Sequence, residues 1–168
     1  MTHVVLVGLM ASGKTTVGRA LAQALGLPFS DSDTQIEKER GLTVRQLDAE
    51  LGTDEMHRLE KEHLLGALAQ DEPSVIAAAA STIDEPEARA ALQAPGVQVI
   101  WLRASTPVLA RRFVRRRHRP LFGRRPESLL AEQAERRAPL FAALHPIEIE
   151  TEGKSVPQVV EAALEALR

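Results

Sequence analysis

The sequence predicts an α/β fold in which helices cover both faces of a parallel β-sheet. Short apolar runs typical of buried strands alternate along the chain with longer segments whose apolar residues recur at helical spacing. The first of these runs leads through a glycine-rich loop directly into a helix. At 168 residues the chain is long enough to bury a core, and we expect residues 1–168 to form a single domain.

The first half of the chain is expected to run strand, helix, strand, helices, strand. His3–Val7 is apolar and mostly β-branched, and the residues behind the loop repeat at helical spacing up to Gly26, a typical helix stop. Gly41 and Gly52 are expected to break the long helical stretch that follows the second strand. We expect strands at 3–7, 27–30 and 74–78, a helix ending at Gly26, and helices within 34–70.

The second half continues the alternation. Asp84-Glu85-Pro86 carries an N-cap signal and opens a helix, and Thr106-Pro107 opens another. Ile147–Glu150 alternates apolar and acidic side chains, which is typical of an edge strand. We expect helices at 84–94, from 106 into an arginine-rich segment, at 126–144 and at 156–167, and strands at 97–102 and 147–150.

Residues 8–15 match the phosphate-binding pattern G-x-x-x-x-G-K-[ST]. The strand before this loop and the helix behind it are the context in which the pattern binds phosphate, because backbone N–H groups at the helix N-terminus then point at the anion. Lys14 would reach the β- and γ-phosphates, and the Thr15 hydroxyl would coordinate Mg²⁺. We expect a nucleoside triphosphate to be held by Gly8, Ala11, Ser12, Gly13, Lys14, Thr15 and Thr16.

Two acidic residues, Asp31 and Asp33, follow the second strand. Ligands of parallel sheets lie beyond the carboxyl ends of the strands, so residues 31–33 and 79–81 should meet the phosphate loop in one crevice. Alternate residues of an extended segment point the same way, so both carboxylates would face that crevice. A kinase needs one carboxylate to support Mg²⁺ and another to orient or deprotonate an acceptor hydroxyl. The alternative is a solvated turn, or an N-cap for a helix beginning near Thr34.

Composition excludes several function classes. The chain has no cysteine, which excludes disulfides, thiolate metal sites and a cysteine nucleophile. The N-terminal apolar run is too short for a signal peptide and no stretch approaches about 18 apolar residues, so we expect no membrane span and a cytoplasmic location. We also expect a monomer. His63 and His118 are expected at the surface and Trp101 in the core.

Positive charge is concentrated in one segment. Residues 111–125 carry eight arginines and no acid, whereas the other 13 basic residues face 23 acidic ones, a net charge of about −10. A nucleic-acid-binding protein would carry such a block, and so would a kinase that gathers positive charge around ATP. Because the block lacks interleaved aromatic residues for base stacking, we favour the kinase and expect no nucleic-acid partner.

Five motifs occur in order along nearly the whole chain. They are Gly8-Leu9-Met10 through Gly13-Lys14-Thr15-Thr16-Val17-Gly18, Asp31-x-Asp33 with Ile36-Glu37, Arg119-Pro120-Leu121, Arg137-x-Pro139-Leu140 and Pro157-x-Val159-Val160. In this ordered set the chain resembles the shikimate kinase family, a branch of the nucleoside-monophosphate-kinase-like P-loop proteins. The resemblance implies a three-layer α/β/α fold with a five-stranded parallel sheet in the order 2-3-1-4-5. It also implies an acceptor-binding helical region at about 34–61 and a small lid at about 112–125.

On the nucleotide side the resemblance implies ATP and Mg²⁺ as cofactors. Asp31 would help to hold Mg²⁺. Arg119, on the lid, would close over the γ-phosphate, and Arg112 and Pro157 would flank the adenine. Ala11 stands where the family often has glycine, but at a variable position of the loop, so phosphate binding should survive.

On the acceptor side the resemblance implies phosphate transfer to a small hydroxylated acid, most simply shikimate to shikimate 3-phosphate. Asp33 would bind the acceptor hydroxyls and assist proton removal, and Arg137 would pair with the acceptor's carboxylate. His57 departs from the family, which has an arginine there that grips the carboxylate. Histidine lacks the planar five-donor fork of arginine. The neighbouring Arg58 cannot replace it, since one residue rotates a helical side chain by about 100°.

The second departure is Ala79-Ala80-Ser81, where the family has three glycines. Alanine in the left-handed conformation open to glycine costs about 1–2 kcal/mol, so we expect the backbone path or the pocket to differ here. Alternatively, the segment keeps its path with negative φ and the methyl groups narrow the pocket. We expect Ala79, Ala80 and Ser81 to contact the acceptor, together with His57.

These departures leave three functions open. The first is a kinase for shikimate, and the second is a kinase for another hydroxylated acid or a polyol such as gluconate. The third is a nucleotide-binding regulatory or RNA-associated protein without kinase activity, which would bind RNA through residues 111–125.

Overall fold

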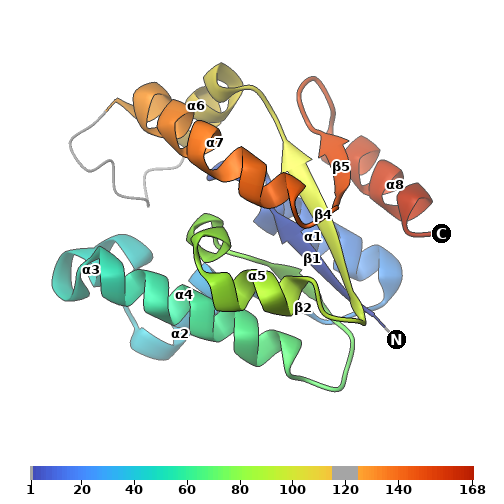
Figure 1. The fold of residues 1–168 in the computed structure, drawn as a ribbon, viewed down its shortest axis with the longest axis horizontal. Coiled ribbons are helices and arrows are strands. Elements are labelled where there is room, and N and C mark those ends of the chain that lie inside the picture. The colour runs from blue at the N-terminus through green and yellow to red at the C-terminus, as the bar shows by residue number, and fades with distance from the viewer. Residues whose placement is uncertain (1, 115–124) are drawn as a thin grey trace.

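The computed structural model of the protein describes residues 2–114 and 125–168 (Figure 1). Within them, one sheet has the strand order β2-β3-β1-β4-β5, and all of its pairings are parallel. The strands are β1 (His3–Val7), β2 (Phe29–Asp31), β3 (Val75–Ala77), β4 (Val97–Arg103) and β5 (Ile147–Glu150). The predicted α/β fold and strand order are confirmed, and β5 lies at the sheet edge, as its alternating sequence predicted.

Helices connect the strands and cover the sheet on both sides. Those before β4 are α1 (Lys14–Leu25), α2 (Ser32–Arg40), α3 (Val44–Leu51), α4 (Thr53–Leu68), the 3-10 helix η1 (Ala80–Asp84) and α5 (Pro86–Leu92). Those after β4 are α6 (Thr106–Val114), α7 (Pro126–Ala142) and α8 (Val156–Ala166). As predicted, the long helical stretch breaks at Gly41 and Gly52.

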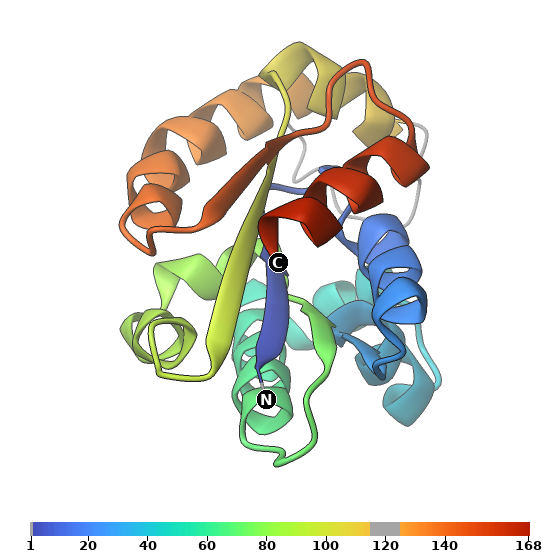
Figure 2. The same ribbon diagram turned by 90° about the vertical axis from the view of Figure 1, so that its right-hand side faces the viewer.

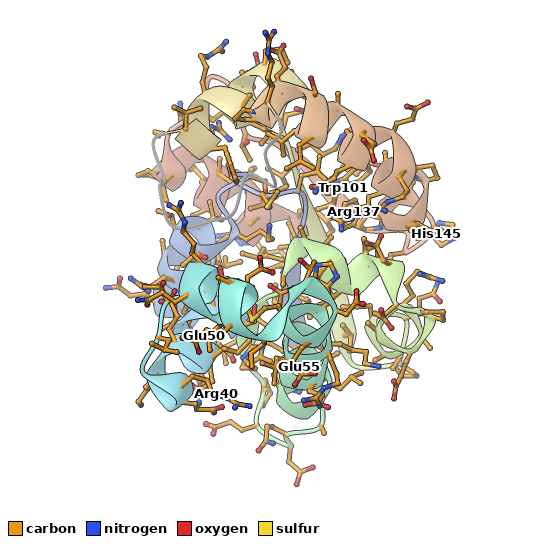
Figure 3. All side chains as sticks on the ribbon, turned by 90° about the vertical axis from the view of Figure 1, so that its left-hand side faces the viewer. Arg40, Glu50, Glu55, Trp101, Arg137 and His145 are labelled. Carbon is orange, nitrogen blue, oxygen red and sulfur yellow. The ribbon has the colours of Figure 1, made fainter. Side chains whose placement is uncertain are left out.

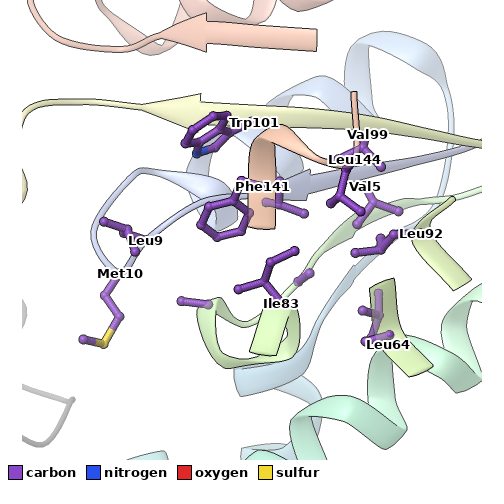
Figure 4. Close-up of a cluster of buried hydrophobic side chains, with 14 of the residues drawn as sticks. Val5, Leu9, Met10, Leu64, Ile83, Leu92, Val99, Trp101, Phe141 and Leu144 are labelled. Atoms are coloured by element: carbon purple, nitrogen blue, oxygen red, sulfur yellow. The ribbon is translucent and has the colours of Figure 1, made fainter. Parts of the chain in front are cut away.

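The alternation of side chains along β1 produces the three layers. Val4 and Leu6 pack on one face with α1 and α8, which lie side by side in front of the strands in Figure 2. Val5 points to the other face and joins the larger core under α4, α5, α6 and α7. Trp101 belongs to this core, as predicted, and its ring lies 5.3 Å from that of Phe141 (Figure 4).

The sequence placed the start of α2 too late. Asp31 ends β2 with extended backbone angles, and its Oδ1 accepts the Thr34 N–H at 3.0 Å as the N-cap of α2. Because this cap begins the helix at Ser32, Asp33 lies in the first helical turn and not in an extended segment. The prediction that Asp31 and Asp33 are alternate residues of one extended segment is therefore wrong. The alternative prediction of an N-cap is correct for Asp31.

The segment after β3, for which either an altered path or the same path with negative φ was expected, stays out of the left-handed region. Ala79 has φ −59° and ψ 145°, and Ala80 begins the η1 turn. Among the described non-glycine residues, positive φ occurs only at Ala11 and His145. The backbone of 79–81 therefore avoids the left-handed region, and alanine and serine are tolerated there without strain.

Gly18 allows α1 to pack closely against β2. A Cβ at this position of α1 would lie 2.6 Å from Phe29 Cε2, so only glycine lets the Phe29 ring pack directly on the helix. This contact sets the end of β2, and with it Asp31, beside the phosphate loop.

No helix among the described residues is long and apolar enough to cross a membrane.

Candidate active site

The phosphate loop, Gly8–Thr15, connects β1 to α1. Gly8 has φ 146°, and a Cβ there would lie 2.6 Å from the Leu102 carbonyl oxygen, so this position requires glycine. Lys14 Nζ donates to the carbonyl oxygens of Gly8 and Leu9, each at 2.9 Å, which holds the ammonium over the loop. Among the described residues, Ser12 Oγ is a buried hydroxyl without a hydrogen-bond partner. Such an orphan group indicates that a ligand completes the site.

Hard oxygen ligands suited to magnesium meet beside the loop. Thr15 Oγ1 donates to Asp31 Oδ2 at 2.6 Å, although the two residues come from α1 and β2. A hydroxyl and a carboxylate are the ligand types that Mg²⁺ takes from a P-loop protein. In the described part of the chain, no group of three or more His, Asp or Glu residues could hold a metal by itself. A magnesium ion here would therefore share its coordination with the phosphates of a nucleotide.

The phosphate pocket lies over this pair. Its walls include Lys14, Thr15, Asp31, Asp33, Ala79 and Phe113. The three segments expected to converge beyond the strand ends therefore do so, because Asp33 reaches the pocket from the first turn of α2. Phe113, from α6, was not anticipated, since nothing in its local sequence marks it.

A second cavity of about 320 Å³ lies behind the loop, between α1 and α8. Arg112 lines it and donates to Thr151 Oγ1 at 3.0 Å and to the Thr151 carbonyl oxygen at 3.2 Å. Ser12 and Thr16 open into the same cavity, which joins it to the phosphate site. Pro157 does not line it; its walls on α8 are Val156 and Val159. Thr151 and Lys154 also line this cavity, and no local sequence pattern indicated either residue.

The third cavity, which we call the Arg137 pocket, adjoins the phosphate pocket. Met10 lines both, and the wall passes directly from Ala79 in one to Ala80 in the other. Its polar walls are Asp48, His57, Glu60, Ser81, Gln133 and Arg137. The structure therefore brings His57, Ala80, Ser81 and Arg137 together from α4, η1 and α7, as predicted.

Ser81 is engaged within the protein. Its hydroxyl donates a short hydrogen bond to Oε2 of Glu60, whose residue is only 4% exposed. A buried carboxylate needs donors, and this serine supplies one from η1 where the resemblance implies a glycine. Ser81 therefore satisfies Glu60 first, and its role toward a ligand is to shape the wall of the pocket.

Among the described residues that line this pocket, Arg137 is the one arginine or lysine, and its guanidinium is always protonated. The residue is 4% exposed and lies where α7 faces η1 (Figure 3). Its Nη2 donates to Asp84 Oδ2 at 2.7 Å, and its Nε lies 3.2 Å from both Asp84 oxygens. Its Nη1 donates to Gln133 Oε1 at 3.2 Å. Nothing in the local sequence around Asp84 indicated this pair, which spans 53 positions.

A sequence model of the family described as "Shikimate kinase" matches residues 10–168. A shikimate kinase of Caulobacter vibrioides is 39% identical over 166 residues, 98% of this chain and 82% of that protein. The chain belongs to the shikimate kinase family. The shikimate kinase of Acinetobacter baumannii, solved in complex with shikimate, superposes with a TM-score of 0.91 at 28% identity, covering 99% of this chain and 93% of that one. The shikimate kinase of Bacteroides thetaiotaomicron superposes with a TM-score of 0.84 at 26% identity, covering 99% and 98%.

As a member of the shikimate kinase family, the chain is a small-molecule kinase. The motifs on which the sequence resemblance was founded therefore identified the family correctly. Arg119 and most of the expected lid, 112–125, lie outside the described residues, and so does His118. Their predicted roles stay predictions.

The location expected for one residue differs from its location in the structure. His63 of α4 was expected at the surface, but it is partly buried, and its Nε2 lies 2.8 Å from Ser30 Oγ of β2. Burial lowers the pKa of His63, against the opposing effect of the nearby carboxylates of Asp31, Glu39 and Asp33. The neutral imidazole is therefore favoured beside the site, and its contact with Ser30 joins α4 to β2, which no local pattern reveals.

Proposed function

We propose that the protein transfers the γ-phosphoryl group of ATP to a hydroxyl of a small hydroxylated acid, with shikimate as the acceptor. The observation that carries this proposal is the junction of two pockets at Met10: one holds Lys14, Thr15 and Asp31, and the other contains Arg137. The family uses ATP as its phosphate donor. The relative from Acinetobacter baumannii was solved in complex with shikimate. A small acid of this kind fits the pocket of this chain, whose wall includes the buried Arg137.

On the donor side, the loop residues would bind and orient the triphosphate. The N-terminus of α1 and the Lys14 ammonium would stabilise the charge that develops on the oxygens of the transferred group. Thr15 and Asp31 would hold Mg²⁺, which would neutralise negative charge on the phosphates of the nucleotide. The cavity lined by Arg112, Thr151 and Val156 would take the adenosine portion.

On the acceptor side, Asp33 would orient the reacting hydroxyl. The hydroxyl oxygen forms a bond to the γ-phosphorus while the bond from that phosphorus to the β,γ-bridging oxygen breaks, and ADP leaves. The hydroxyl proton passes to the Asp33 carboxylate, which lines the phosphate pocket. Arg137 would pair with the acceptor's carboxylate and fix the distance between the hydroxyl and the phosphate.

A coupled assay of ADP release tests this proposal. We expect release that depends on both ATP and shikimate, and we expect Asp33→Asn to abolish it, because the amide cannot take the proton. Asp71→Asn, an equivalent change at an exposed position far from the site, should leave the rate unchanged. ADP release that is independent of shikimate, or an Asp33→Asn variant of full activity, would refute the proposal.

A second candidate keeps the kinase and changes the acceptor to another hydroxylated acid or a polyol. The favouring observation is the altered wall of the Arg137 pocket, where His57 and the side chains of Ala80 and Ser81 replace an arginine and glycines. The same assay over a panel of hydroxylated acids and polyols separates the two. Turnover of shikimate with the lowest KM of the panel would exclude this candidate. The single-domain organisation, the monomeric state and the cytoplasmic location stay predictions.

A further inference from the structure

The contacts of Arg137 are divided between two edges of its guanidinium. The edge formed by Nε and Nη2 faces Asp84, with the shortest contact at 2.7 Å from Nη2 to Oδ2. The end formed by Nη1 and Nη2 carries the remaining N–H groups, of which one contacts Gln133 Oε1 at 3.2 Å. A guanidinium offers two such forks, and each fits one carboxylate.

The two edges also differ in their surroundings. Arg137 and Gln133 line the Arg137 pocket, whereas Asp84 is not among the residues of its wall. Gln133, which contacts Nη1, therefore shares the wall of the cavity, whereas Asp84, at the end of η1, contacts Nε and Nη2 from outside that wall. The Asp84 side chain is 29% exposed, and Arg136 also contacts its Oδ2 at 3.2 Å. Asp84 is thus held between two arginines of α7, and Arg136 faces solvent.

This arrangement matters more in this chain than it would with a second arginine in the pocket. His57 occupies the α4 position where the family has an arginine, so within the described part of the wall Arg137 alone offers a bidentate fork. A single fork holds a carboxylate in one orientation only if the fork itself cannot rotate. The buried guanidinium is fixed by its pairing with Asp84, since an unpaired charge at 4% exposure is strongly disfavoured.

We propose that Asp84 is a positioning residue for the acceptor: it occupies the Nε–Nη2 edge of Arg137 and thereby presents the Nη1–Nη2 end to the acceptor's carboxylate. The proposal rests on the proposed function and adds to it a determinant of acceptor recognition. When the acceptor binds, its carboxylate takes the end fork, and Gln133 gives up its contact with Nη1. Asp84 itself touches neither the acceptor nor the nucleotide.

The test compares Asp84→Asn and Asp84→Glu with the wild-type enzyme in steady-state kinetics. Replacing a charge-assisted pair by a neutral one should raise the KM for shikimate roughly tenfold in Asp84→Asn, with kcat and the KM for ATP nearly unchanged. Asp84→Glu keeps the charge and should recover a large part of the lost affinity. Glu87→Gln is the matched control, because this exposed carboxylate of α5 pairs with Lys61 and lies outside the Arg137 pocket.

The methyl ester of shikimate separates positioning from a merely structural role. The ester lacks the carboxylate charge, so wild type and Asp84→Asn should use it with the same, elevated KM. An equal fold-change for acid and ester would overturn the proposal, and so would an unchanged or lowered KM for shikimate in Asp84→Asn. Loss of folding in every Asp84 variant, measured by circular dichroism, would make the residue structural and would overturn it as well.

The outcomes also distinguish this inference from the proposed function. If the wild-type enzyme releases ADP with shikimate while Asp84→Asn behaves like wild type, only the inference is wrong. If the wild-type enzyme shows no dependence on shikimate, both are wrong.

Discussion

The two sides of the site are built in different ways. The phosphate site is built around the continuous segment Gly8–Thr16, and β2, the first turn of α2, the end of β3 and α6 complete its walls. The Arg137 pocket takes its walls from α3, α4, η1 and α7, which are far apart in the sequence. Apart from Ala11, the donor side keeps the residues of the phosphate-loop motif, whereas the acceptor side differs from the family at His57 and at 79–81. A site built around one loop can therefore be recognised from neighbouring residues, whereas a pocket gathered from separate elements cannot.

The largest effect is expected on the donor side. Lys14→Ala removes the ammonium that contacts the loop carbonyls and would stabilise the transferred phosphate. We expect kcat to fall by roughly 10³-fold, because electrostatic stabilisation is the main catalytic term in phosphoryl transfer. ADP release at saturating ATP and shikimate measures it. Lys154→Ala, in the cavity behind the loop, is the control and should change mainly the KM for ATP. Equal losses of kcat in both variants would contradict the special role of the loop.

The next effect is expected on the acceptor side and has the opposite sign. His57→Arg restores the fork implied by the resemblance, and one charge-assisted hydrogen bond is worth about 1.5–3 kcal/mol. We therefore expect the KM for shikimate to fall about tenfold or more, with the KM for ATP unchanged. His145→Arg adds the same charge at an exposed position just beyond the C-terminal end of α7 and should have no effect (Figure 3). No gain in His57→Arg would show that the pocket is built around a different ligand.

A smaller effect concerns the stability of the acceptor wall. Ser81→Ala removes the hydroxyl that donates to buried Glu60, and we expect a loss of about 1–3 kcal/mol in the free energy of unfolding. Ser128→Ala, at an exposed position of α7, should change it by less than about 0.5 kcal/mol. Chemical denaturation of both variants gives the comparison. A neutral Ser81→Ala would mean that Glu60 does not depend on η1.

The smallest expected effect is on the pH dependence of stability, through the partly buried His63. Burial lowers the pKa of His63 below its ordinary value of 6.5, so the unfolded chain binds the proton more readily than the folded one. The stability that the neutral His63 contributes is present above about pH 6.5 and is lost as the pH falls below that value. His63→Gln should reduce the loss of thermal stability between about pH 7 and pH 5. An identical acid profile in both proteins would contradict the burial argument.

The sequence predicted the features that depend on neighbours along the chain. The phosphate loop, the breaks at Gly41 and Gly52 and the edge position of β5 all follow from local residue types, and all are confirmed. Asp31 shows the limit of such reasoning. Its contact with Thr15 was anticipated as a shared magnesium site, but its capping of α2 shifts Asp33 into a helix.

The features that the sequence missed all join segments far apart in the chain. The pairing of Asp84 with Arg137 spans 53 positions, and the contact of His63 with Ser30 spans 33. Thr151 enters the nucleotide side through its contacts with Arg112. Each of these depends on how helices pack on the sheet, and a single sequence does not encode that packing in any periodic or local pattern.

The central claim is that the two pockets form one kinase site, and the product of the reaction tests it most directly. Phosphorus NMR of a mixture of the protein, ATP, Mg²⁺ and shikimate should show ADP and one phosphate monoester of shikimate in equal amounts. Omitting shikimate should stop the loss of ATP. Inorganic phosphate in place of the ester, or ATP that stays intact with shikimate present, would contradict the account.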